Sequence, residues 1–150
     1  MLDSFERFTL LISSISKKIQ RIKTDEMRLI DLKSSHVSCI YYLNKFGPLT
    51  AKALCDHCQE DKALISRSID FLEKKGYISY NSNTTKKYNC LLYLTDKGNS
   101  AALIVTNKIN EAVETIQKKL TDQERVSLYS ILDKIDLAMK TILDEKENEN

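Results

Sequence analysis

The sequence predicts a mainly α-helical fold that contains one small β-hairpin. Over most of the chain, apolar residues recur every three or four positions, which places them on one face of a helix. Segment 77–95 is the exception, because its β-branched and aromatic residues lie on both sides of a polar stretch at 81–87, as in a hairpin. With three glycines and one proline among 150 residues, the chain has little material for long loops.

Two helices are expected before the centre of the chain. The first carries its apolar residues on one face: Phe5, Phe8, Ile12, Ile15, Ile19 and Ile22. The serine pair at 34–35 can cap a second helix that runs to about Lys45. Gly47 and Pro48 then end it, since proline cannot continue a helix.

The centre of the chain predicts two helices with a short turn between them. Thr50 can cap the first of these, whose inward residues would be Ala51, Leu54, Cys55 and Cys58. After a polar turn at 59–61, the next helix is expected over 62–75 and ends at Gly76. Its inward residues would be Ile65, Ile69 and Leu72. Two helices joined by a tight polar turn and followed by a hairpin form a winged helix–turn–helix.

Two long helices are expected after the hairpin. Thr95 can cap the fifth helix of the chain, and Thr121 with Glu124 forms a capping box that opens the sixth. Their apolar stripes are Ala102, Val105, Ile109, Ala112, Ile116 and Leu120, then Leu128, Leu132, Ile135, Met139 and Ile142. The first, fifth and sixth helices carry more apolar surface than the small centre can cover, so a second copy of the chain is the expected partner.

The predicted organisation is a single domain over residues 1–150. It has a winged helix–turn–helix lobe at 34–98 and N- and C-terminal dimerisation helices at 1–23 and 99–143. Residues 34–98 hold nine Lys or Arg against six Asp or Glu, whereas residues 99–150 hold seven against ten. A basic middle beside an acidic tail favours a polyanion as the partner of the middle, and ordinary variation of surface charge is the alternative.

The cysteines and the apolar runs predict a cytoplasmic protein. No segment approaches the roughly 18 consecutive apolar residues of a membrane-spanning helix, and the N-terminus does not have the pattern of a secretory signal. Four cysteines without such a signal indicate reduced thiols in a cytoplasm.

The pair Cys55 and Cys58 has the CxxC spacing of zinc ligands. A closed zinc site needs four ligands, however, and the chain has one CxxC. Core packing is therefore the favoured interpretation, because free cysteine behaves as a small apolar residue. No metal and no cofactor are expected, although a redox or metal role for Cys39, Cys55, Cys58 or Cys90 stays open.

Several short motifs follow one another at fixed spacings. They are Leu49-Thr50, Leu54-Cys55 with Cys58, Ser66-Arg67, Leu72-Glu73-Lys74-Lys75-Gly76 and Leu94-Thr95-Asp96-Lys97-Gly98. In this order they resemble the MarR family of bacterial transcription regulators (multiple antibiotic resistance regulators) over nearly the whole chain. The resemblance implies a repressor that is often released by a small ligand bound between the dimerisation helices and the winged lobe. His36 stands near that crevice and is a candidate ligand contact, although a capping or surface histidine is the favoured interpretation.

The helix over 62–75 is the expected reader of DNA. A helix fits the major groove, and its N-terminal residues reach base edges. The expected contacts are Lys62, Ala63, Leu64, Ser66 and Arg67, and on the hairpin tip Asn83, Thr84, Lys86 and Lys87. The alternative for Arg67 is an ion pair with Asp70 or Glu73 in its own helix. The tip also lacks the Asp and Arg that are usual in the family.

The expected function is that of a homodimeric, sequence-specific transcription regulator, a ligand-responsive repressor on a pseudo-palindromic operator in double-stranded DNA. Two alternatives stay open. One is a dimeric winged-helix module that binds a protein in place of DNA, and the other is a regulator that senses redox state or a metal through cysteine. An enzyme is not expected, because the chain has no nucleophile elbow, phosphate loop or paired-carboxylate motif.

Overall fold

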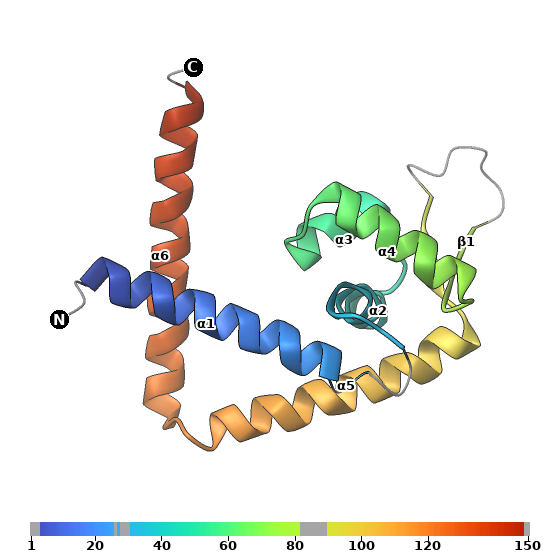
Figure 1. Ribbon diagram of the computed structural model, residues 1–150, viewed down its shortest axis with the longest axis horizontal. Helices are drawn as coiled ribbons and strands as arrows, with labels where there is room; N and C mark the ends of the chain where they lie inside the picture. The colour runs from blue at the N-terminus through green and yellow to red at the C-terminus, as the bar shows by residue number, and fades with distance from the viewer. Residues whose placement is uncertain (1–3, 26, 28–30, 82–89, 149–150) are drawn as a thin grey trace. The chain divides into compact units, whose positions relative to one another are not determined.

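The computed structural model describes residues 4–25, 27, 31–81 and 90–148, and it confirms the predicted order of elements (Figure 1). The elements within these ranges are α1 (Ser4–Asp25), α2 (Ser34–Phe46), α3 (Ala51–Cys58), α4 (Lys62–Lys74), β1 (Ile78–Tyr80), β2 (Leu92–Leu94), α5 (Asp96–Gln117) and α6 (Asp122–Asn148). In the ranges that the structure describes, none of the helices combines the length and the apolar character needed to cross a membrane.

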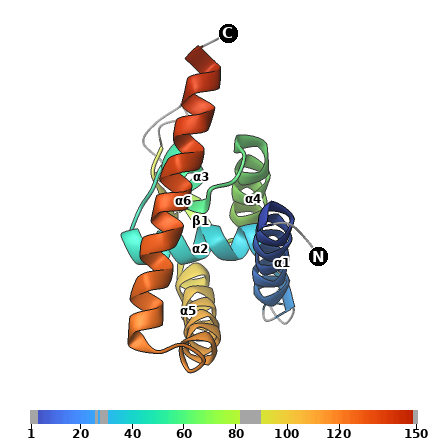
Figure 2. The same cartoon turned by 90° about the vertical axis from the view of Figure 1, so that its left-hand side faces the viewer.

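The chain divides into two units, residues 1–109 and residues 110–150. Every buried side chain among the described residues belongs to the first unit. The largest of them are Met27, Ile40, Leu54, Ile65, Leu72, Leu92, Val37, Val105, Cys39 and Ser68. In both views α2 lies below α3 and α4 (Figures 1 and 2), and it packs against both. The core therefore buries one face of α4 and leaves the other exposed.

The predicted caps of α3 and α5 are confirmed. The Thr50 hydroxyl accepts a hydrogen bond from the Ala53 backbone N–H at 3.2 Å, and the Thr95 hydroxyl accepts one from the Gly98 N–H at 3.1 Å. Each cap satisfies a backbone donor that has no partner within the first turn of its helix.

The beginning of α2 differs from the prediction that Ser34 or Ser35 caps it. Lys33 is the N-cap residue, and its backbone N–H donates to Nδ1 of His36 at 3.1 Å. The histidine ring reaches back to the cap in the way that a Glu or Gln does in a capping box. This agrees with the interpretation of His36 as a capping residue.

The two strands confirm the base of the predicted hairpin. They pair antiparallel, with Ile78 opposite Leu94 and Tyr80 opposite Leu92. Leu92 also donates its backbone N–H to the Leu49 carbonyl at 2.9 Å, which joins the hairpin to the connection between α2 and α3. The hairpin is thus attached to the helix–turn–helix by a long-range backbone bond as well as by side chains.

The second unit contains the end of α5 and all of α6, and α6 begins at the predicted capping box. The Thr121 N–H donates to Glu124 Oε2 at 2.8 Å, and the Glu124 N–H donates to the Thr121 hydroxyl at 3.2 Å. These hydrogen bonds from the Thr121 backbone and side chain lower the pKa of Glu124. Both orphan donors at this helix start are therefore satisfied.

Most of the predicted apolar stripes of α1 and α6 are exposed within the single chain, and Phe8 and Ile135 are half-buried. On α1 the exposed residues are Phe5, Leu10, Leu11, Ile12, Ile15, Ile19 and Ile22. On α6 they are Val126, Leu128, Tyr129, Ile131, Leu132, Leu137, Met139, Ile142 and Leu143. Apolar patches of this extent mark interaction surfaces in soluble proteins.

Candidate nucleic-acid interface

The first turns of α4 present a polar, basic face to solvent. Lys62, Ala63, Ser66 and Arg67 are exposed, and Leu64 is half-buried. The opposite face contributes Ile65, Ile69 and Leu72 to the core. The structure therefore brings the five residues predicted on this helix to one accessible stretch.

Polar contacts fix the position of α4 on the rest of the lobe. Asp61 caps the helix, and its Oδ1 accepts from the Leu64 N–H at 2.7 Å. The buried Ser68 hydroxyl lies 2.9 Å from the Ser35 hydroxyl on α2 and 2.9 Å from the Leu64 carbonyl oxygen. The single hydroxyl proton of Ser68 can be donated to the Leu64 carbonyl, and Ser35 can then donate its own hydroxyl proton to the Ser68 oxygen.

A ring stack provides a second connection between α2 and α4. The rings of His36 and Phe71 are nearly parallel, with centroids 4.1 Å apart. His36 is buried, and this burial together with the charge of Lys33 lowers its pKa. The histidine predicted as a candidate ligand contact therefore packs against Phe71 of α4.

Arg67 is available for an external partner. Within the part of the chain that the structure describes, Arg67 forms no ion pair. The intrahelical alternative with Asp70 or Glu73 is therefore not what the structure shows. An exposed guanidinium on a capped helix is suited to bidentate binding of a phosphate or a guanine edge.

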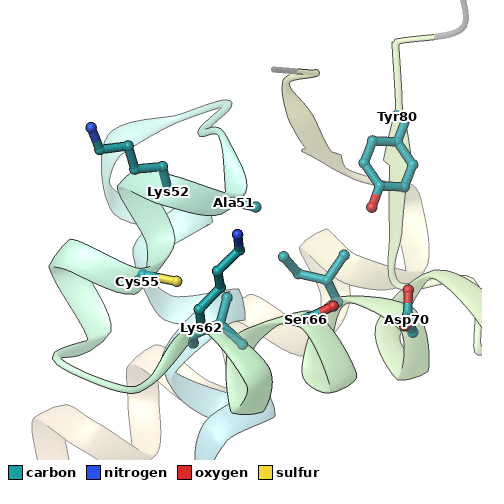
Figure 3. A pocket seen from close by; sticks show the side chains of 9 residues that line it. Ala51, Lys52, Cys55, Lys62, Ser66, Asp70 and Tyr80 are labelled. Atoms are coloured by element: carbon teal, nitrogen blue, oxygen red, sulfur yellow. The ribbon is translucent and has the colours of Figure 1, made fainter. Parts of the chain in front are cut away.

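A hollow of about 450 Å³ opens beside this face, between α3, α4 and β1 (Figure 3). Its lining residues are Ala51, Lys52, Cys55, Lys62, Ile65, Ser66, Ile69, Asp70 and Tyr80. In Figure 3 the side chains of Lys62 and Ser66 rise from α4, and the Tyr80 hydroxyl points toward Asp70. The accessible surface thus continues from α4 onto α3 and the first strand.

Three residues of this surface were missed by the sequence analysis: Lys52, Asp70 and Tyr80. Strand alternation offers a signal for Tyr80, because it lies two residues after the buried Ile78 and so on the same side of β1. Lys52 and Asp70 carry no such signal, since an exposed charge on a helix is ordinary.

The hairpin-tip residues Asn83, Thr84, Lys86 and Lys87 lie outside the described residues. Their role in DNA binding stays a prediction. The described strands lead into and out of that tip, and Tyr80 and Leu92 form the last pair of the described ladder.

The four cysteines are free thiols. Cys39 and Cys90 are buried, and Cys55 and Cys58 are half-buried. Cys39 lies within the core, and Cys55 and Cys58 pack against it, as their predicted inward positions require. Among the described residues, no group of three or more His, Cys, Asp or Glu side chains is arranged to hold a metal ion.

No protein-family model matches the sequence, and no curated protein does. Solved structures nevertheless match the coordinates closely. A MarR family regulator from Neisseria meningitidis has a TM-score of 0.83 and 19% sequence identity, and the match covers 97% of this chain and 99% of that one. The chain has the MarR fold.

Two further structures that match this chain hold other molecules. A cysteine-to-serine mutant of MarR from E. coli, in complex with operator DNA, has a TM-score of 0.73 and 20% identity over 89% of this chain and 99% of that one. An organohalide-sensing regulator bound to 2,4-dichlorophenol has a TM-score of 0.76 and 20% identity over 90% of this chain and 80% of that one. Identities this low establish the shared fold alone.

Proposed function

We propose that this chain is a cytoplasmic, homodimeric transcription regulator that binds a pseudo-palindromic operator through α4 and the hairpin tip and represses the adjacent gene. The observation that carries the proposal is the exposed face of Lys62, Ser66 and Arg67 on a helix whose other face is buried and hydrogen-bonded. The structure of MarR from E. coli in complex with operator DNA supports DNA as the partner of this chain.

The dimer is supported by the exposed apolar residues of α1 and α6. Full burial of a large apolar side chain contributes about 1.5–3 kcal/mol, and association costs about 4–15 kcal/mol, so the exposed residues of both helices are needed together to favour the dimer. A two-fold dimer places two copies of α4 roughly one DNA turn, about 34 Å, apart. The operator would then have two inverted half-sites with that spacing. In this proposal residues 1–23 and 99–143 are the dimerisation helices and residues 34–98 the DNA-binding lobe.

A small-molecule effector is the natural means of release. The organohalide-sensing regulator, which matches this chain and holds 2,4-dichlorophenol, supports this kind of control. An effector must bind more tightly to the conformation that cannot hold DNA, because a molecule with equal affinity for both shifts nothing.

Selection of bound sequences from random duplex DNA tests the proposal. The expected product is an inverted repeat with half-sites about one helical turn apart. The matched control is the Arg67→Ala variant, which keeps the fold and should enrich the repeat far less. Recovery of unbiased sequences by the folded dimer would instead favour the module that binds a protein, to which the exposed Asp70 on the same face lends some support.

A further inference from the structure

A buried pair of hydroxyl groups attaches the middle of α4 to the first turn of α2. Ser68 is only 2% exposed, and its hydroxyl oxygen lies 2.9 Å from that of Ser35. The Ser68 hydroxyl also bonds to the Leu64 carbonyl one turn earlier in α4. A buried hydroxyl without partners would be costly, so this one is stable only while α4 keeps Ser68 opposite Ser35.

Other contacts between α4 and the rest of the lobe are less directional. The side chains of Ile65, Ile69 and Leu72 join the core that α2 shares, and burial of apolar surface favours no particular angle. The rings of His36 and Phe71 are parallel within 4°, and stacked rings tolerate a range of offsets. A hydrogen bond, by contrast, weakens steeply when its angle is wrong. The serine pair therefore selects one position of α4 on α2 more sharply than these contacts do.

The turn of α2 that carries Ser35 is itself attached to α1. The Ser38 hydroxyl donates to the Ser34 carbonyl oxygen at 3.2 Å and accepts from Lys23 Nζ, on α1, at 3.1 Å. Ser38 is buried, which strengthens both bonds relative to bonds in water. Ser35 is thus a fixed support, because polar contacts hold its turn in place from the side opposite to α4.

We propose that the Ser35–Ser68 pair is a positioning element for DNA recognition, which holds α4 in the one position from which its exposed face reads the operator. This inference rests on the proposed function. Ser68 belongs to the buried face of α4, so the pair acts through the helix and not by contact with DNA. Without the pair, α4 would occupy other positions for part of the time. The operator affinity then falls in proportion to the fraction of molecules that stay in the competent position.

The size of the effect follows from the strength of one hydrogen bond. Its usual net stabilisation corresponds to a factor of about 2–12 between the competent position and the others. Loss of the pair should therefore weaken operator binding by up to about 12-fold. Binding to unrelated duplex DNA should change little, because it depends on charge and not on the fit of α4 in the groove.

Fluorescence titrations of the selected operator and of unrelated duplex DNA test this inference on the full-length protein. Ser35→Ala and Ser68→Ala should each bind the operator about 2–12 times more weakly. The double variant should be no weaker than Ser68→Ala, since both changes remove the same contact between helices. The slope of log affinity against log salt should stay the same, whereas a lost phosphate contact would flatten it. A flattened slope would thus contradict a positioning role.

Ser34→Ala serves as the control from the same helical turn. Ser34 is also half-buried, but its backbone carbonyl, and not its hydroxyl, accepts the bond from Ser38. This variant should bind the operator like the unsubstituted protein. The double variant Ser35→Ala/Ser68→Ala should keep its melting temperature, because replacing both partners of a buried hydrogen bond by apolar groups is nearly neutral. A double variant that keeps its operator affinity, whatever its stability, would overturn the inference.

Amide hydrogen exchange without DNA separates the attachment of α4 from the proposed function. The amides of α4 should exchange faster in the double variant than in the unsubstituted protein, while those of α5 should be unaffected. If the unsubstituted protein binds no operator and α4 still responds in this way, the proposed function fails and the attachment by the serine pair stands. Unchanged exchange in α4 would refute the attachment itself.

Discussion

Replacement of Gly98 by alanine should destabilise the protein, although alanine is the better helix former. Gly98 lies in the first turn of α5, and a Cβ atom there would stand 2.0 Å from the Tyr77 carbonyl oxygen and 3.1 Å from Leu94 Cδ2. Helix propensity alone predicts the opposite sign, a gain of up to about 1 kcal/mol. The sign of the change in unfolding free energy therefore shows whether the steric clash or the helix propensity dominates.

The Tyr77 carbonyl cannot move away without cost. It accepts hydrogen bonds from the Thr95 backbone N–H at 3.0 Å and from the Thr95 hydroxyl at 3.2 Å. The same hydroxyl lies 2.6 Å from the Gly76 carbonyl oxygen. Relief of the clash requires α5 and this turn to separate by about 1 Å, which a packed core resists. The substitution thus strains the cap of α5 and the end of the turn that precedes β1.

The expected net loss is about 1–5 kcal/mol. Overpacking of a core costs about 1–3 kcal/mol. Weakening two hydrogen bonds adds about 0.5–1.5 kcal/mol for each. Alanine also reduces the conformational freedom of the unfolded chain, which offsets the loss of stability by about 0.4–1 kcal/mol.

Urea unfolding followed by circular dichroism, at one fixed protein concentration, measures this loss. Gly76→Ala is the control, because Gly76 has a positive φ of 77° but nothing within 4 Å of its added Cβ. This variant should lose only about 1 kcal/mol of unfolding free energy. The left-handed backbone is unfavourable for alanine, but alanine also reduces the freedom of the unfolded chain, which offsets part of that cost. A Gly98→Ala protein as stable as the original would refute the steric argument.

Four further outcomes are expected. Arg67→Ala should weaken operator binding by about 1–3 kcal/mol in a fluorescence titration and leave the melting temperature unchanged. Because the folded state lowers the pKa of His36, the unfolded chain binds its proton more readily, and stability should fall as the pH drops below 6.5. His36→Gln, which keeps a cap acceptor, should remove that part of the pH dependence of the unfolding free energy. Deletion of residues 1–22 should give monomers or aggregates by light scattering and abolish specific DNA binding; a soluble dimer with normal affinity would contradict the proposed role of α1. Lys86→Ala should flatten the slope of log affinity against log salt by about 0.9 for each phosphate that the protein no longer neutralises, with little change in sequence preference.

The sequence predicts local features well and long-range ones poorly. The caps at Thr50 and Thr95 were predictable because a hydroxyl and the N–H that it accepts lie within one turn. The cap of α2 was predicted wrongly, because the serines at 34 and 35 are common capping residues. In the structure the acceptor is instead a ring nitrogen of His36, which binds the backbone N–H of Lys33. The bridge from Leu49 to the hairpin has no local signature at all.

The candidate site shows the same difference between local features, which the sequence predicts, and long-range ones, which it does not. The residues of α4 were predicted because a helix fixes which side chains share a face. Tyr80 and Lys52 were missed because they join that surface only when β1 and α3 pack beside α4.

Stability and DNA binding are expected to depend on the same apolar side chains. No described side chain of α1 or α6 is buried within one chain. An isolated helix gains little from its own hydrogen bonds, and most helical stability in proteins comes from packing of the apolar face. The second copy that covers these faces would therefore order the helices and also set the spacing of the two copies of α4. If so, the melting temperature and the operator affinity should both rise with protein concentration, whereas the melting temperature of a protein that folds and works as a monomer would be independent of it.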